Sequence, residues 1–166
     1  AMIQRLIPVF IFFSGLMFAA EQPTVIVLTG APGSDKYGRL FAKWTGQWKQ
    51  AATRGGADFH QIDKPEEDTT KKAAQKLITA LASEAKSPLW LVLIGHGTFD
   101  GKKAKFNLHG PDLEAGELAK WLKGSQRPIA IINCTSSSAP FLQALNRKGR
   151  VVITATRSGF EQNFSH

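Results

Sequence analysis

The sequence has few of the residues that build several common kinds of functional site. Cys134 is the only cysteine among 166 residues, which excludes an intrachain disulfide and any zinc or iron–sulfur site that needs several cysteines. No Gly-x-Ser-x-Gly segment occurs, which argues against a serine α/β-hydrolase. The composition, 43% hydrophobic and 20% charged, is that of a globular domain and excludes a collagen-like or disordered chain.

Positive charge is abundant but scattered. Lysine and arginine number 21 against 13 acidic residues, giving a net charge of +8. The basic residues are spread along the chain, form no stripe interleaved with aromatic side chains, and accompany no known DNA- or RNA-binding pattern. We therefore expect a solvated basic surface and no nucleic-acid partner.

The first twenty residues differ from the rest of the chain. Arg5 precedes the run Leu6–Ala20, which is apolar apart from a few positions. Such a run is short for a membrane span, which needs about 20 residues, but suits the core of a secretory signal. We expect residues 1–20 to be a signal peptide or, alternatively, a retained N-terminal anchor. Either way the sequence predicts export to the periplasm or the extracellular space, with membrane contact only through this segment.

From residue 21 onward, apolar strand-like runs alternate with segments of helical periodicity. Apolar runs bounded by turn residues predict strands over 24–29, 58–62, 89–94, 129–132 and 151–156. Helical spacing predicts helices over 37–53, 67–86, 113–122 and 137–146, and a glycine-bounded hairpin over 98–110. Strands that are apolar on both faces indicate a mostly parallel sheet between helices. We expect residues 21–166 to form one α/β domain, a three-layer sandwich with flavodoxin-like strand winding. Because the last predicted strand ends ten residues before the C-terminus, a missing final helix and strand is one interpretation.

Two reactive side chains follow two of the predicted strands. Open parallel sheets bind ligands beyond the carboxyl ends of their strands. His96 and Cys134 are the first reactive side chains after the strands 89–94 and 129–132. If those strands are neighbours, a base and a thiol share one edge of the sheet. Cys134 also precedes a predicted helix, whose N-terminal dipole would favour the thiolate.

The order and setting of these residues resemble those of the legumain- and caspase-type cysteine peptidases. VLIGHG (92–97) resembles their apolar strand ending in His-Gly, and AIINCTSSSAPFL (130–142) resembles their strand ending in the nucleophile. VVITATRSGFEQN (151–163) resembles the next strand, and VIVLTGAPGSDKYGR (25–39) is similar to the first strand and its loop in legumains. The resemblance covers about residues 24–166, although its His-Gly and Cys elements are short.

The resemblance implies a caspase/legumain-like fold and hydrolysis of peptide bonds in a peptide or protein substrate. It implies that Cys134 is the nucleophile and that His96 donates a proton to the leaving amine. The backbone N–H groups of Gly97 and Cys134 would form the oxyanion hole. Arg39, with Thr156 and Ser158 opposite, would line the substrate-binding pocket.

The sequence departs from both families beside the nucleophile. Thr135 stands where legumains carry an acidic residue, and Ile132-Asn133 stands where caspases carry Gln-Ala. A preference for cleavage after Asn or Asp is therefore not implied. A catalytically inactive recognition domain of an envelope-associated protein is the main alternative, because some bacterial legumain-like relatives lack the nucleophile.

Two further interpretations involve glycine-rich or histidine-bearing segments. A flavodoxin-like module would bind a small anion near Gly30–Ser34, but Asp35 and Tyr37 flank Lys36 where a phosphate-binding loop needs Gly and Ser or Thr. His96 and Asp100 are four residues apart, yet no larger cluster supports a metal site. We expect no metal and no cofactor. The sequence leaves the oligomeric state open.

Overall fold

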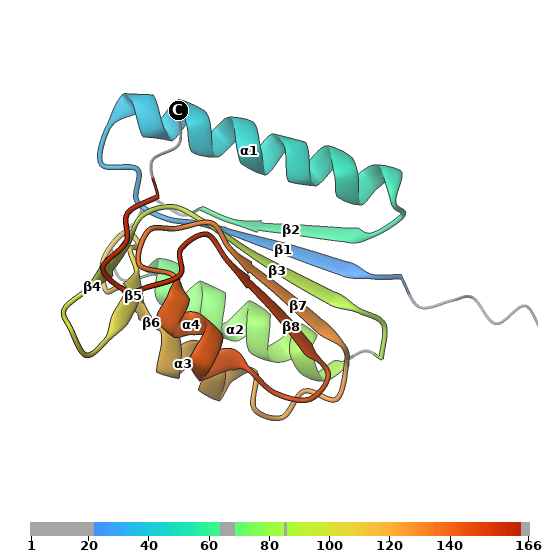
Figure 1. Cartoon of the computed structure of the whole chain (residues 1–166). Coiled ribbons are helices and arrows are strands. Elements are labelled where there is room, and N and C mark those ends of the chain that lie inside the picture. Colours follow the sequence, from blue (N-terminus) through green and yellow to red (C-terminus); the bar gives the residue numbers. More distant parts are fainter. Residues whose placement is uncertain (1–21, 64–68, 85, 164–166) are drawn as a thin grey trace, which may run out of the picture.

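The chain folds into three layers, as the sequence predicts. A computed structural model describes residues 22–63, 69–84 and 86–163. Its central layer is a parallel sheet of five strands in the order β2-β1-β3-β7-β8. Helix α1 lies on one face, and α2, α3 and α4 lie on the other (Figure 1). The α/β fold class is therefore confirmed, whereas the predicted signal segment 1–20 lies outside the described residues.

The elements follow the predicted alternation closely. The five strands of the main sheet are β1 (Thr24–Thr29), β2 (Asp58–Ile62), β3 (Leu89–Ile94), β7 (Ile129–Asn133) and β8 (Arg150–Thr154). The helices are α1 (Asp35–Arg54), α2 (Thr69–Glu84), α3 (Ala115–Trp121) and α4 (Ala139–Leu145). A second, antiparallel sheet contains β4 (Gly97–Phe99), β5 (Ala104–Phe106) and β6 (Leu113–Glu114).

The second sheet corrects one prediction. The segment 113–122 was expected to be helical throughout, but α3 begins only at Ala115. Leu113 and Glu114 instead pair with Phe106 and Lys105 of β5. A capping box between Glu114 and Glu117 then starts the helix, since the side chain of each accepts the backbone N–H of the other. Helical periodicity does not reveal a two-residue strand, because that strand is set by its distant partner.

Alternate residues of the strands face two separate cores. On the α1 face, Val25, Val27, Val92 and Ile94 pack with Phe41 of the helix. On the opposite face, the intervening residues of β1 and β3 pack against the three remaining helices: Ile26, Leu28, Leu91 and Leu93. Burial on both faces explains why these strands are continuous apolar runs in the sequence.

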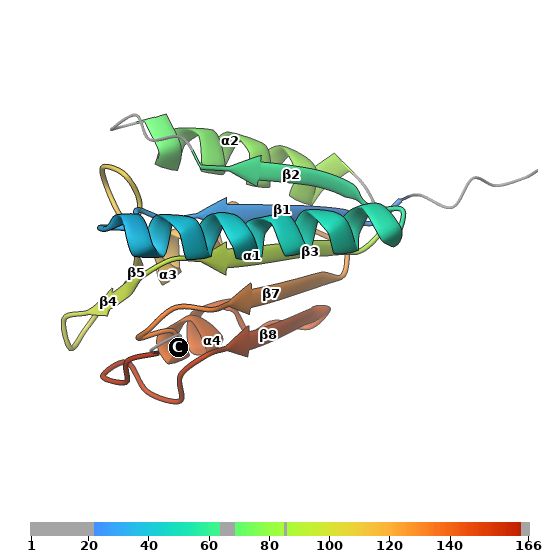
Figure 2. The same cartoon turned by 90° about the horizontal axis from the view of Figure 1, so that it is seen from above.

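Helix α1 covers only part of its face of the sheet. It lies over β1 and β3, and no described helix lies over β7 and β8 on that side (Figure 2). Val151 and Ile153 of β8 are consequently 59% and 52% exposed. An apolar strip of the sheet therefore borders α1 along its side nearest β7.

The usual ligand crevice of this topology is filled by protein. The connections from β1 and β3 leave in opposite directions, so a crevice is expected beyond the carboxyl ends of these two strands. Gly30 and Gly95 follow those ends, and the fully buried ring of Phe106 from β5 packs against both. A Cβ on Gly95 would lie 2.9 Å from this ring, and one on Gly30 would overlap the carbonyl oxygen of Asn107. Both positions therefore require glycine, and Phe106 occupies the crevice.

Candidate functional site

His96 is held in a defined orientation just beyond β3. Its Nε2 lies 3.0 Å from the carbonyl oxygen of Pro32, which can only accept, so Nε2 carries a proton. The half-buried ring also packs edge-on against Tyr37 and Phe41 of α1, at centroid distances of 4.6 and 5.3 Å. In the neutral ring Nδ1 is therefore the basic nitrogen. Within the described residues Nδ1 has no hydrogen-bond partner, so His96 has the orientation and the nitrogen that a proton-transfer residue needs.

Cys134 follows β7 at the same edge of the sheet. The β3–β7 register pairs Leu93 with Asn133, so Cys134 stands beside Ile94, two residues before His96 on the neighbouring strand. The thiol shares a hollow with Ile94 and with side chains of α1, which places it on the α1 face. His96 contacts α1 as well, so the predicted pair occupies one edge and one face.

The electrostatic setting of the thiol differs from the prediction. Cys134 is exposed, but the protein atoms around it desolvate the sulfur and raise the pKa of the thiol above its ordinary value. The expected stabilisation of a thiolate by a following helix is wrong, because α4 begins only at Ala139 and the shift is upward. The resting thiol is therefore neutral near pH 7.

His96 and Cys134 open into two different hollows. The polar hollow, of about 430 Å³, is lined by His96, Gly97 and Ser136 among others. The apolar hollow, of about 420 Å³, is lined by Cys134 together with Trp44, Gln47, Trp48, Ala51, Ile94 and Asn163. Asn163 lines both, and within the described ranges no hydrogen bond joins His96 to Cys134. The structure thus brings the pair to one edge of the sheet but into different hollows.

The two predicted oxyanion donors differ in availability. The N–H of Asn107 donates to the carbonyl of His96 at 3.0 Å, so Gly97 and Phe106 form a non-hydrogen-bonded pair of the β4–β5 ladder. In such a pair the N–H points away from the partner strand, which leaves that of Gly97 directed outward. The N–H of Cys134 instead donates to the carbonyl of Leu93 at 3.0 Å. In this conformation the N–H of Cys134 is bonded within the sheet, and the N–H of Gly97 is the available donor.

Gly97 also sets how closely the two loops approach each other. A Cβ at this position would overlap the carbonyl oxygen of Ser136 and lie 2.6 Å from Oγ1 of Thr135. Real side chains do not make such contacts, so only glycine fits. The loop that follows Cys134 therefore rests directly on the backbone that follows His96.

The loop after Cys134 is fixed by its neighbours. The buried side chain of Asn133 accepts the N–H of Thr135 at 3.0 Å. Ser137 adopts a φ of 55°, which is uncommon outside glycine, and donates its N–H to the carbonyl of Glu161 at 2.9 Å. Asn163 donates its side-chain amide to the carbonyl of Cys134 at 3.0 Å and its N–H to Oγ of Ser136 at 2.8 Å. The segment after β8 thus stabilises the loop that follows the thiol through these hydrogen bonds.

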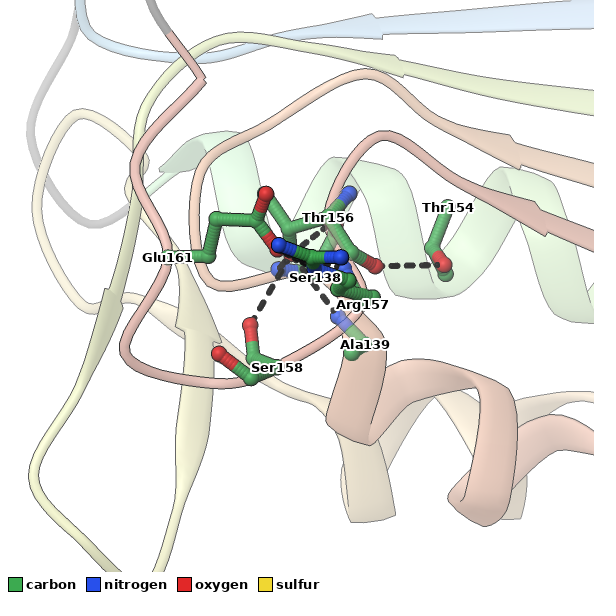
Figure 3. Close-up of polar contacts among 7 residues, drawn as sticks. All are labelled: Ser138, Ala139, Thr154, Thr156, Arg157, Ser158 and Glu161. Atoms are coloured by element: carbon green, nitrogen blue, oxygen red, sulfur yellow. Dashed lines mark hydrogen bonds and ion pairs between the residues drawn. The ribbon is translucent and has the colours of Figure 1, made fainter.

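Thr156, predicted to line a substrate pocket, has its hydroxyl committed to the fold. It accepts the N–H groups of Ser138 and Ala139 at 2.9 and 3.2 Å and donates to the carbonyl of Ser158 at 3.0 Å (Figure 3). Ser158 itself is exposed, and so is Arg39 on α1. No hydrogen bond or ion pair in the described part of the chain joins Arg39 to either residue. The structure does not bring these three residues together as one pocket.

The hydrogen bonds of the Thr156 hydroxyl predict a loss of stability when the hydroxyl is removed. Thr156→Val keeps the shape but leaves buried N–H groups without an acceptor, so we expect the free energy of unfolding to fall by about 2 kcal/mol. Thr156→Ser keeps the hydroxyl and serves as the matched control. Urea unfolding of both variants measures the difference. Equal stability of Thr156→Val and the wild type would contradict the structural role.

Asn163 and a tryptophan pair are further residues of the site that the sequence-based predictions above do not include. Trp44 and Trp48 pack on the core, but they are only half-buried and also line the apolar hollow. Their spacing of four residues was visible, but the exposed side of the pair depends on where α1 stops covering the sheet. Asn163 has no sequence signal, because its position depends on how the chain turns back after β8.

The other candidate sites gain no support in the described residues. The N–H of Gly30 donates to Ile94 and that of Ala31 to Asn107, both to carbonyl oxygens, so these donors of the glycine loop are not free for an anion. Within the described ranges, no group of three or more His, Cys, Asp or Glu side chains could hold a metal ion. In the same part of the chain, every helix is too short or too polar to cross a membrane.

Comparison with known proteins adds no assignment: no family model matches the chain, and no curated protein is significantly similar to it in sequence.

Proposed function

We propose that the chain is a cysteine-type peptidase domain in which Cys134 attacks the substrate carbonyl and His96 transfers the proton. The observation that carries this proposal is the placement of both side chains at one edge and on one face of the sheet, after adjacent parallel strands. The N–H of Gly97, which follows His96 and lies against the loop after Cys134, supplies a donor for a developing oxyanion. The apolar segment Leu6–Ala20 favours export, so we propose peptide or protein substrates outside the cytoplasm.

The proposed reaction begins with a neutral thiol and a neutral imidazole. The sulfur of Cys134 forms a bond to the carbonyl carbon while its proton passes to Nδ1 of His96, directly or through one water molecule. The carbonyl oxygen gains the negative charge and accepts from the Gly97 N–H. The imidazolium then gives its proton to the leaving amine as the C–N bond breaks. Water hydrolyses the resulting thioester and regenerates the thiol.

Replacement of the nucleophile tests this assignment. With a pool of internally quenched peptides of random sequence as the probe, Cys134→Ala should reduce turnover to the uncatalysed rate. His96→Gln should reduce it about 100-fold or more, because the proton transfer is lost. His60→Gln, a change on β2 far along the sheet from β7, is the matched control and should leave turnover unchanged. Turnover that survives Cys134→Ala would overturn the proposal.

The raised thiol pKa predicts the direction of the pH dependence. Because the reactive thiolate forms only as the pH rises through this pKa, alkylation of Cys134 by iodoacetamide should be slower at pH 8 than alkylation of glutathione. The rate should still be increasing at about pH 9, where an unperturbed thiol is already mostly ionised. Stopped-time alkylation followed by intact-protein mass measures both. A rate that levels off below about pH 8 would contradict the desolvated setting.

A second candidate is a recognition domain with a peptidase-like fold and no turnover. Two observations favour it: the N–H of Cys134 is already bonded within the sheet, and the resting thiol is neutral. If the domain only recognises a partner, the wild type should cleave no member of the peptide pool. Cys134→Ala should then be as inactive and as stable as the wild type. The comparison of wild type and Cys134→Ala therefore separates the two candidates.

A further inference from the structure

The apolar hollow beside Cys134 is open, and its walls have one chemical character. Trp44 and Trp48, one helical turn apart on α1, form one wall with Ala51, and Ile94 of β3 contributes another part of the lining. Both indole rings are half-buried, so part of each is available to a bound group. Aromatic walls of this kind gain most by covering apolar surface.

The uncharged lining of the hollow limits the chemical groups that can bind there. None of its lining residues is charged, and its polar side chains, apart from the Cys134 thiol, are the amides of Gln47 and Asn163. A charged group placed there would lose its hydration without gaining a partner, which is costly. The polar hollow of His96, by contrast, is lined mainly by hydroxyl and amide side chains and glycines, although Phe99 and Phe160 also contribute. The two sides of the site therefore favour different chemistry.

Further apolar side chains lie on the same face of the sheet as the hollow. Ile132 lies two residues before Cys134 on the same face of β7, and the register pairs it with Ile153 of β8. Ile153 is 52% exposed, since no described helix covers this part of the face. Apolar side chains thus extend from beside the sulfur toward β8 on this face of the sheet.

We propose that the apolar hollow is a specificity site for an uncharged apolar or aromatic side chain of the peptide whose carbonyl Cys134 attacks. The inference rests on the proposed peptidase function for the identity of the occupant. The contact of Trp48 and Trp44 with a group attached near the sulfur can be measured without turnover. Trp44 and Trp48 then determine substrate preference, and the polar hollow receives the leaving amine near His96.

Labelling of Cys134 with two neutral maleimides tests the hollow directly. We compare N-benzylmaleimide with N-methylmaleimide on the full chain at constant pH, each rate divided by that for glutathione. The wild type should favour the benzyl reagent about tenfold, the size expected for partial burial of a phenyl ring. Trp48→Ala should reduce this preference to twofold or less. Trp121→Ala, on α3 and against the core on the opposite face of the sheet, is the matched control and should keep the preference.

The outcomes separate this inference from the peptidase proposal. No benzyl preference in the wild type, or a preference that survives in both Trp48→Ala and Trp44→Ala, overturns the specificity site even if turnover depends on Cys134. A preference lost in Trp48→Ala but kept in Trp48→Phe supports an aromatic wall. If the preference holds and no peptide is cleaved, the hollow has the proposed ligand chemistry and only the peptidase function fails. Circular dichroism of each variant identifies any change that merely unfolds the chain.

Discussion

Arg127→Ala is expected to lower the free energy of unfolding by about 4 kcal/mol, the largest stability effect we anticipate for a single replacement. The side chain is 3% exposed and lies in the turn before β7. Its guanidinium donates to the carbonyls of Leu81, Ser87 and Pro88 and to the hydroxyl of Thr24, at 3.0 Å for the last. One charged group thus ties the end of α2 to the starts of β1 and β3. Its loss removes these hydrogen bonds from the carbonyls and leaves a cavity where the guanidinium was.

Two further variants make the Arg127 result specific. Arg127→Lys keeps the charge but replaces the planar five-donor group by a single nitrogen, so it should recover less than half of the loss. Arg157→Ala removes an arginine that is 94% exposed and pairs with Glu161 at 3.8 Å, and should change stability by less than about 0.5 kcal/mol. Urea unfolding at one pH measures all three. A loss below about 1 kcal/mol for Arg127→Ala would show that water replaces the guanidinium without penalty.

The role of Arg127 marks the limit of what the sequence predicts about the fold. The strands of the main sheet were predictable because Thr24–Thr29 and Leu89–Ile94 are apolar on both faces, a property of adjacent residues. Arg127 bonds to a hydroxyl 103 residues away, and no local pattern encodes such a contact. In the sequence it counts only as one of 21 basic residues on a solvated surface. Its burial can be known only once the strand order is known.

The candidate site also has features that the sequence predicts and features that it does not. The edge shared by His96 and Cys134 followed from the two strand ends, since parallel neighbours finish at one edge. That the two side chains open into different hollows, both lined by Asn163, did not follow, because it depends on the irregular segment after β8. The pKa of the thiol could not be predicted either. Its direction reflects the side chains gathered around the sulfur, not the residues next to it in the chain.

Thr156 shows that a sequence pattern does not reveal what a hydroxyl is bonded to. The predicted strand 151–156 ended at Thr156, but β8 ends at Thr154, and the Thr156 hydroxyl stabilises the start of α4. A threonine that caps a helix and one that contacts a substrate look identical in a sequence. Burial and the donors already bound to the oxygen distinguish them, and both are properties of the folded chain.

Gly97→Ala is the replacement from which we expect the largest effect on the site itself. The new methyl group would overlap the Ser136 carbonyl, a backbone atom that cannot rotate away, so the loops after His96 and Cys134 must separate. That movement displaces the available oxyanion donor, and we expect peptide turnover to fall at least 100-fold. The free energy of unfolding should fall by about 2 kcal/mol, as for other overpacked positions.

A matched glycine shows whether the effect of Gly97→Ala comes from this contact. Gly116 lies on α3 with no atom near its Cβ position, so Gly116→Ala should keep turnover and raise stability by about 0.5–1 kcal/mol through helix propensity. Peptide turnover and urea unfolding are measured for both variants. The stability loss of Gly97→Ala is expected whether or not the domain is an enzyme, because it depends on the Ser136 contact alone. Wild-type stability in Gly97→Ala would show that the two loops are not in contact, and would remove the structural basis for placing His96 and Cys134 in one site.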